Sequence, residues 1–412
     1  MLIHRACLIL FLFFSAELSA ADINVDSILD ESDSSCMDGD CSLRDAIALA
    51  SDADRVIVPT GTYLLTLGVL EPSVDLEIIG AGAQQTIIDA QGNSNVFEIN
   101  GIFDITLADM TITSGVSGRG GGVHSIGANL TLQNCIVSDS SAFNGGGVVG
   151  DGGTLLIDRC AIIDNLADGN SGAGVLASGA SLTIINSTIS GNQAPAMGRV
   201  GGGVAVFGEL PRSPEMAGTD ETQGSPPIQN VSIRNTTITN NSAEAEGGGI
   251  FVSSGGGSFV SVSNSIIANN VSGMDCSEAI LSDGYNLDSD GSCGLTGVGD
   301  LSGINPLLDA IGLNSGTTPN FLPQAGSPVI NAGNPAAVDS SDQACVGIDQ
   351  RGILRPQDSR CEIGSIEVEG VGPGPGDLPP VTEVPALNRF GLLLMIACML
   401  LLGFYGSRRM LK

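Results

Sequence analysis

The sequence predicts an all-β fold, a parallel β-helix, and three recurring patterns carry the prediction. A short phrase of alternating apolar residues, such as LTLQNCIV from Leu130, recurs along the middle of the chain. Its copies begin at Ile105, Leu130, Leu155, Leu182, Val231 and Val260, in steps of 25, 25, 27, 49 and 29 residues. Alternation is typical of strands, and a repeat of this length fits one coil of a solenoid that buries its apolar face on the next coil. By analogy with other such solenoids, we expect a right-handed helix.

Turn residues keep the same period. A glycine-rich phrase recurs at Gly120, Gly145, Gly172, Gly201 and Gly247. Two columns of polar residues follow the apolar phrase, the first at Asp109, Asn134, Arg159, Asn186, Asn235 and Asn264, and the second at Asn165, Asn192, Asn241 and Asn270. Asparagine tolerates the left-handed backbone of a tight corner, and stacked amides can bond along the axis. Each coil is therefore predicted to hold two or three short strands.

The chain divides into six predicted segments. They are a signal peptide (1–20), an N-terminal cap (21–55), the β-helix (56–301), a loop-rich C-terminal cap (302–369), a Pro/Gly linker (370–385) and a sorting or transmembrane tail (386–412). The 49-residue step of the repeat contains a polar, Pro-rich insertion at 208–227. Removing it restores the period, so the coils on either side should stack directly.

The segment before the first coil carries the pattern of a capping helix. Apolar residues between Leu43 and Ala50 recur at helical spacing, and Ser42 with Asp45 gives a capping box. An open end of a β-helix exposes strand edges and apolar core. A short amphipathic helix is therefore expected to cover the N-terminal end.

Both ends of the chain carry targeting patterns. Residues 1–20 contain Arg5, an apolar run and small residues before Ala21, which is typical of a secretory signal peptide. At the other end, an apolar run of 16 residues, Phe390–Tyr405, precedes Arg408 and Arg409. This run is predicted to form a hydrophobic helix that enters a membrane, at least transiently, with the basic end on the inside.

A short motif precedes this apolar helix. Together with the basic end it comprises Val384, Pro385, Ala386, Leu387, Phe390, Gly391, Arg408 and Arg409. The three-part layout resembles the IPTL/PEP-CTERM class of bacterial sorting tails. Members usually have Thr where Ala386 stands and Trp where Phe390 stands. The resemblance implies recognition by a sorting protease.

Eight of the ten cysteines lie between the predicted leader and tail. An even number in an exported chain indicates disulfides. Spacing pairs Cys36 with Cys41, Cys276 with Cys293, and Cys345 with Cys361. Cys135 and Cys160 occupy the same column of adjacent coils, where we expect either a strained disulfide or a stacked pair of free thiols.

Several longer motifs lie between Cys36 and Glu367. They are CSLRDAI from Cys41, GYNLDSDGSCGLTGVGDLSGINPLL from Gly284, GSPVINAG from Gly326, and DQRGILRP with CEIGSIE between Asp349 and Glu367. In this order they resemble the choice-of-anchor Q family, CSLREA-type bacterial surface proteins. The resemblance implies a pectin-lyase-like right-handed β-helix and an anchoring tail, but no reaction. The segments Asp349–Gly352 and Arg355–Pro356 are expected to form a buried closing clasp.

The composition excludes some functions. The chain has 15 Lys and Arg against 45 Asp and Glu, a formal charge of −30. So acidic a surface repels phosphate and argues against a nucleic-acid partner. Apart from His4 in the predicted leader, His124 is the only histidine, which argues against a catalytic triad or a histidine-based zinc site.

An enzyme is the alternative to a binding protein, because many pectin-lyase-like β-helices cut acidic polysaccharides. A calcium-dependent lyase needs clustered Asp ligands and a basic residue that takes a proton. The candidates are Asp158 or Asp164 with Arg159 or Arg234, and Asp139 lies one coil from Asp164. Such residues are more often a solvated face, and fold alone implies no reaction.

The segment Asn286–Gly291 resembles the first half of a calcium loop. Asn286, Asp288 and Asp290 place oxygen ligands at alternate positions, but Gly297 stands where the bidentate Glu belongs. A structural turn beside Cys293 is the favoured interpretation. Calcium is the one cofactor that the sequence suggests.

These features favour a non-catalytic, exported protein of the cell surface, outer membrane or extracellular space that contacts glycan or matrix through a long acidic face. An outward hydroxyl column offers such contacts, although β propensity alone explains it; its members are Thr106, Thr131, Thr183, Ser232 and Ser261. A secreted polysaccharide lyase or glycoside hydrolase is one alternative, and a structural surface rod is another. The expected partners are extracellular glycan or matrix and, through the tail, a membrane and a sorting protease.

Overall fold

The computed structural model describes residues 20–37, 39–169, 171–208, 230–253 and 259–368. Nearly all of the predicted leader and of the insertion lie outside these residues, as do the linker and the tail with its sorting motif and hydrophobic helix. Within the described ranges, no helix is both long enough and apolar enough to span a membrane.

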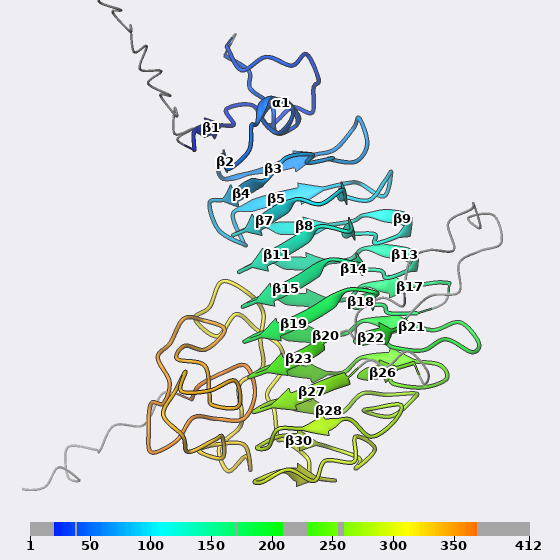
Figure 1. The fold of residues 1–412 in the computed structure, drawn as a ribbon, viewed down its shortest axis with the longest axis vertical. Helices are drawn as coiled ribbons and strands as arrows, with labels where there is room; N and C mark the ends of the chain where they lie inside the picture. Colours follow the sequence, from blue (N-terminus) through cyan, green and yellow to red (C-terminus); the bar gives the residue numbers. More distant parts are fainter. Residues whose placement is uncertain (1–19, 38, 170, 209–229, 254–258, 369–412) are drawn as a thin grey trace, which may run out of the picture. The chain divides into compact units, whose positions relative to one another are not determined.

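Strands of successive coils pair in parallel and form the predicted β-helix (Figure 1). Two sheets contain ten strands each, a third contains six and a fourth contains five. The sequence predicts two or three strands in a coil, whereas the middle coils contain four. The additional sheet consists of strands of two or four residues, too short to show an alternating pattern.

Sheet A carries the recurring apolar phrase. In spatial order its strands are β1 (Asp22–Asn24), β2 (Asp54–Val58), β4 (Leu76–Gly80), β7 (Asp104–Ala108), β11 (Asn129–Gln133), β15 (Thr154–Asp158), β19 (Ser181–Ile185), β23 (Asn230–Arg234), β27 (Phe259–Ser263) and β29 (Leu281–Ser282). Leu182 of β19 lies opposite Val231 of β23. Adjacent coils therefore flank the insertion, as predicted.

Three further sheets complete the coil. Sheet B consists of β3 (Gly61–Leu64), β5 (Thr86–Asp89), β8 (Thr111–Thr113), β12 (Ile136–Ser138), β16 (Ala161–Ile163), β20 (Thr188–Ser190), β24 (Thr237–Thr239), β28 (Ile266–Ala268), β30 (Leu287–Asp288) and β31 (Leu301–Ser302). Sheet D consists of β9 (Val116–Arg119), β13 (Ser141–Asn144), β17 (Leu166–Ala167), β21 (Gln193–Ala194) and β25 (Ser242–Ala243). Sheet C consists of β6 (Phe97–Asn100), β10 (Val123–Ile126), β14 (Val148–Asp151), β18 (Val175–Ser178), β22 (Val204–Phe207) and β26 (Ile250–Val252).

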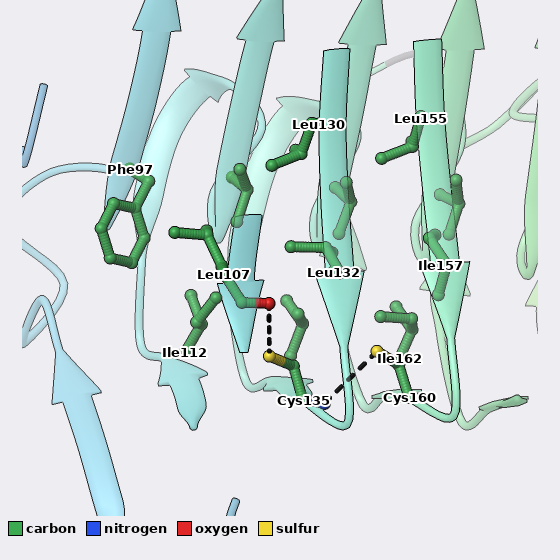
Figure 2. Packing of buried hydrophobic residues seen from close by; sticks show 14 of the residues in the cluster. Phe97, Leu107, Ile112, Leu130, Leu132, Cys135, Leu155, Ile157, Cys160 and Ile162 are labelled. Carbon is green, nitrogen blue, oxygen red and sulfur yellow. Dashed lines mark hydrogen bonds between the residues drawn. The ribbon is translucent and has the colours of Figure 1, made fainter. Parts of the chain in front are cut away.

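Alternate apolar residues of the sheets fill the interior. Figure 2 shows Leu107, Leu132 and Ile157 of sheet A one after another in consecutive coils, with Ile112 and Ile162 of sheet B in the same core. All five side chains are fully buried. Burying an aliphatic side chain of this size contributes about 1.5–3 kcal/mol. The same rows recur in each coil, so the repeat itself builds the core.

Two corners turn the chain between sheets, and both require left-handed backbone. The corner from sheet A to sheet B has φ between 45° and 56° at the predicted column of Asp109, Asn134, Arg159, Asn186, Asn235 and Asn264. The corner after sheet B also has positive φ, at Ser114, Asp139, Asp164, Gly191, Asn240 and Asn269. Asn, Asp and Gly adopt this conformation at the lowest cost, which explains their recurrence.

The residue after the second corner builds a buried amide ladder. Asn165 donates through Nδ2 to Oδ1 of Asn192 at 3.0 Å, Asn192 donates to Asn241 at 2.9 Å, and Asn241 donates to Asn270 at 3.0 Å. Each accepting Oδ1 also receives the backbone N–H of the ladder residue in the coil before. The predicted stacking of this column is confirmed.

The turn between sheets D and C is too narrow for side chains. A Cβ on Gly121 would lie 2.5 Å from the carbonyl oxygen of Ser141, and one on Gly122 would lie 2.7 Å from that of Gly147. Only glycine fits there, which explains the recurring glycine phrase.

Helix α1 (Leu43–Leu49) is the predicted N-terminal capping helix. Ser42 is its N-cap, and the Ser42 Oγ accepts the N–H of Asp45 at 3.1 Å. Leu43 and Ile47 are buried in the same apolar core as the first strands. The helix therefore extends the core beyond the first coil instead of leaving it open.

The C-terminal region returns along the side of the stack, against the outer face of sheet B (yellow to orange in Figure 1). Thr317 Oγ1 donates to Asn134 Oδ1 at 2.5 Å, and Thr188 Oγ1 donates to Gln350 Oε1 at 2.7 Å. Further along, the backbone N–H of Ser365 donates to Thr237 Oγ1 at 3.1 Å. The region is rich in loops, as predicted. Much of it covers the flank of the stack and not its end, because its hydrogen-bond partners are outward polar groups of sheet B and of the first corner.

The three disulfides predicted from spacing are present, Cys36–Cys41, Cys276–Cys293 and Cys345–Cys361. Cys135 and Cys160 are free and buried, so a disulfide between them is wrong and the stacked thiols are correct. Cys135 Sγ donates to Leu107 O at 3.3 Å, and the Cys135 N–H donates to Cys160 Sγ at 3.3 Å (Figure 2). Each sulfur points to the backbone of the preceding coil, and stacked Cβ atoms one coil apart exceed the separation of about 3.8 Å that disulfides favour.

The buried thiols are expected to be inert in the folded protein. Burial raises the pKa of the Cys160 thiol, with Cys135 adding to the effect, and the thiolate is the reactive form. Alkylation without reductant, followed by peptide mass spectrometry, should leave both cysteines unlabelled in the native chain and label both in denaturant. Labelling of either one under native conditions would contradict the packing described above.

The amide ladder is expected to be a main source of stability. Asn241→Ala leaves the buried amide groups of Asn192 without their shared acceptor, and we expect a loss of about 2–3 kcal/mol in the free energy of unfolding. The matched control is Asn230→Ala on the exposed face of the same coil, which should change it by less than about 0.5 kcal/mol. Urea unfolding of both variants measures the difference, and equal losses would show that the ladder adds nothing.

Candidate functional site

Titratable side chains gather on the outer face of sheet C in its first three strands. Glu98 of β6 lies opposite His124 of β10, and Asp151 ends β14 in the next coil. Arg119, the last residue of β9, contributes a guanidinium. Four ionisable groups from adjacent coils thus meet on one surface, and we call them the sheet C cluster.

Asp151 is the centre of this cluster. Its Oδ2 lies 2.8 Å from His124 Nε2 and accepts a hydrogen bond from Arg119 Nε at 2.5 Å, while its Oδ1 accepts one from the other end of the guanidinium. Burial acts to raise the pKa of Asp151, but the bonds from His124 and Arg119 outweigh it, so the pKa lies below its usual value. Asp151 is therefore held as a carboxylate.

His124 is almost fully buried, and a carboxyl group lies on each side of its ring. Its Nε2 faces Asp151, and its Nδ1 lies 3.9 Å from Glu98 Oε2, beyond hydrogen-bond reach. A carboxylate at Nε2 favours the tautomer with hydrogen on that nitrogen, which leaves Nδ1 as the basic atom. Chemically, the His124–Asp151 pair can act as a general base. Together with Arg119 and Glu98, it can also tie three coils together through ion pairs.

Sequence reasoning missed this cluster because a single histidine was discounted. The signal available was spacing, since Glu98 and Asp151 lie 26 and 27 residues from His124, or one coil in each direction. A search for ionisable residues one period apart would have found the cluster.

The residues that the sequence suggested for catalysis do not form one site. Asp158 and Arg159 pair with each other at the first corner, with Asp158 Oδ2 3.2 Å from Arg159 Nε. Arg234 donates instead to Asp342 of the C-terminal region, at 3.2 Å and 3.3 Å. Asp164 lies at the second corner, across strand β16 from Arg159.

Asp164 and Asp139 occupy the same corner position in neighbouring coils. Burial raises the pKa of Asp164, and the charge of Asp139 raises it further. The acidic pair predicted from the sequence is therefore present, but the arginine expected to act with it lies at the other corner.

The predicted calcium segment forms a hydrogen-bonded turn. Asn286 Oδ1 accepts the N–H of Ser265 at 3.0 Å, and Asp288 Oδ2 accepts that of Cys293 at 3.2 Å. Asp290 Oδ1 accepts the N–H of Ser292 at 2.9 Å. These bonds fix the turn around the Cys276–Cys293 disulfide, the structural role that the sequence favoured. Among the described residues, no group of three or more His, Cys, Asp or Glu side chains is arranged to hold a metal ion.

The outward hydroxyl column lies in register on sheet A. Thr106 pairs with Thr131, and Thr183 pairs with Ser232, which pairs with Ser261. Leu156 occupies the coil between Thr131 and Thr183. The side chains are half-buried, and the apolar residue interrupts the row.

Of the residues expected to form the closing clasp, Asp349, Gln350 and Arg355 are buried, whereas Gly352 and Pro356 are exposed. Arg351 donates to Asp349 Oδ2 from Nε at 3.0 Å and from the end of its guanidinium at 2.8 Å. Arg355 donates to Glu367 Oε2 at 3.0 Å. The two arginines thus bind the start and the end of the C-terminal motif to each other.

No protein-family model and no curated protein sequence matches the chain. Among solved structures, the chain is similar to a pectate lyase, Pel9A, with 15% sequence identity and a TM-score of 0.40. The similarity covers 85% of this chain and 97% of the lyase. Neither a substrate nor a reaction follows from a similarity at this level.

Asp151→Asn tests the sheet C cluster. A carboxyl group whose folded-state pKa is depressed stabilises the fold above its unfolded pKa of about 3.9, and this contribution is lost as the pH falls through the folded pKa. We therefore expect Asp151→Asn to lower the free energy of unfolding at pH 7, because the bonds to His124 and Arg119 lose their charged acceptor. The loss should be only about 1–2 kcal/mol, because partial exposure to solvent screens the ion pairs. The difference from the wild type should shrink below about pH 4.

Urea unfolding between pH 3 and pH 7 measures this effect. Glu77→Gln, an exposed carboxyl group on strand β4, is the matched control and should leave stability nearly unchanged. If Asp151→Asn lowers the free energy of unfolding by the same amount at every pH, the contribution of Asp151 comes from its packing and not from its charge.

Proposed function

We propose that the chain is a non-catalytic, exported cell-surface protein that uses its β-helix as a rigid scaffold for contact with glycan or matrix. The proposal rests mainly on one observation, the separation of the expected catalytic groups. Asp158 with Arg159, Arg234 with Asp342, and Asp139 with Asp164 lie at different places. A lyase needs its acid, base and metal ligands around one bond.

Two further features support export. Three disulfides are typical of proteins from oxidising compartments. The leader and tail patterns of the sequence agree with passage across a membrane, and the tail would supply the contact with a sorting protease. On a cell surface, the stacked coils would present the same few outward columns over many repeats to a partner.

A secreted polysaccharide lyase or hydrolase is the second candidate. Two observations favour it, the raised pKa of Asp164 beside Asp139 and the orientation of His124 by Asp151. Either would supply a side chain that takes or gives a proton beside a bound substrate. In this case the substrate would be an acidic polysaccharide that lies against one of these two surfaces.

The proposal is tested with the purified chain on a glycan array and in reducing-end and unsaturated-product assays, with and without calcium. We expect binding without turnover. Product formation that is abolished by Asp164→Ala or His124→Asn would establish an enzyme and contradict the proposal. Absence of both binding and product would leave the structural rod in its place.

A further inference from the structure

Five charged side chains are buried together in the C-terminal region. They are Asp349, Glu362, Glu367, Arg351 and Arg355, and each side chain is at most about 5% exposed. Three carboxyl groups thus face two guanidinium groups. If all five were charged, the cluster would carry one buried negative charge without a partner, a state that is costly away from water.

The geometry shows which carboxyl group lacks a cation. Asp349 is paired with Arg351 at 2.8 Å, and Glu367 with Arg355 at 3.0 Å. The oxygens of Glu362 instead accept two backbone N–H groups, those of Asn331 and Val368, both at 3.2 Å. Its own N–H donates to Glu367 Oε2 at 3.3 Å, which places the two glutamates against each other.

Among the described residues, no arginine outside the cluster pairs with Glu362, and Arg355 donates to its backbone carbonyl at 3.4 Å. Arg360 precedes Glu362 by two residues, but its guanidinium donates to the carbonyl groups of Ala332 and Gly333 and lies 5.3 Å from the Tyr285 ring centre. The nearby contacts from sheet B are the uncharged Thr188 and Thr237, which bond Gln350 and Ser365. A proton on Glu362, whose side chain hydrogen-bonds that of Glu367, would neutralise the cluster.

We propose that this cluster is a pH-sensitive latch, which holds residues 303–368 on the outer face of sheet B while Glu362 and Glu367 share a proton and loosens that region when the proton leaves. Burial, together with Glu367, raises the pKa of Glu362 to about 8. In the released region the same carboxyl group would titrate near its ordinary value, about 4.3.

The sign of the effect follows from these two values. Between about pH 4.5 and pH 8 the closed state binds one proton more than the open state, so opening becomes more favourable as the pH rises. One proton changes the opening equilibrium by up to about tenfold per pH unit. Above about pH 8 both states are ionised, and the dependence levels off. The latch is tightest in mild acid.

The region can open without unfolding the coils. Cys345–Cys361 lies within it and Cys276–Cys293 lies within the last coils, so no disulfide among the described residues joins it to sheet B. Its contacts with sheet B and the first corner are hydrogen bonds, several of them grouped around Asn264, Gln350 and Ser365, with one small apolar cluster around Val329 and Ile363. Such a unit opens at lower free energy than a continuous core.

Hydrogen exchange with mass spectrometry on the full chain between pH 5 and pH 9, corrected for the intrinsic exchange rate, tests the proposal. In the wild type, protection of residues 303–368 should fall by up to about tenfold per pH unit as far as pH 8, while strands of sheet A keep theirs. Glu362→Gln cannot ionise and should remove this dependence. Asp358→Asn, an exposed acid in the same loop, should behave as the wild type.

Two results would overturn the latch. One is a loss of protection that proceeds equally in residues 303–368 and in sheet A, which would indicate general unfolding. The other is an unchanged pH dependence in Glu362→Gln. If that variant does not fold, the wild type alone tests the latch. Only the latch predicts that the pH dependence of protection differs between residues 303–368 and sheet A.

Discussion

The left-handed corner after the strands of sheet A from β7 to β27 is the constraint on which the rest of the fold depends. Parallel strands pair in register only if every coil turns at the same place, and the corner residues keep φ near 50° from Asp109 to Asn264. A coil that turned one residue later would place its apolar side chains on the outer face. The amide ladder that begins at Asn165 fixes the second corner in the same way, since each coil satisfies a buried N–H group of its neighbour.

The same corners hold the C-terminal region. A corner amide that projects outward has an oxygen and two N–H groups to satisfy. Asn134 accepts from Thr317, Asn235 accepts from the N–H of Val346, and Asn264 accepts from that of Asn334. The regular spacing of the coils thus provides a row of docking points along the flank of the stack for residues 303–368, which contain no helix or strand.

Most of the fold could be predicted from the sequence because each coil repeats the same pattern of apolar strand positions and corner residues. The apolar rows, the corner columns and the stacking of Leu182 on Val231 across the insertion all follow from the period. The short strands of sheet D could not be predicted, since pairs such as Leu166–Ala167 are too short to show alternation. The sheet C cluster and the path of the C-terminal region depend on contacts between residues that are distant in the sequence, and the repeat pattern does not predict such contacts.

Departures from the repeat are where function has to be sought in such a fold. The outward row of sheet C begins with Glu98 and His124 and continues in register as Val149, Leu176, Ala205 and Phe251. The backbone geometry of the coil does not require a polar residue in this row, because the later members of the row are apolar. The charged start is therefore an addition to the scaffold, whereas the asparagines of the ladder are part of it. Glu362 departs from the repeat as well, because it is buried, forms no ion pair among the described residues and accepts two backbone N–H groups.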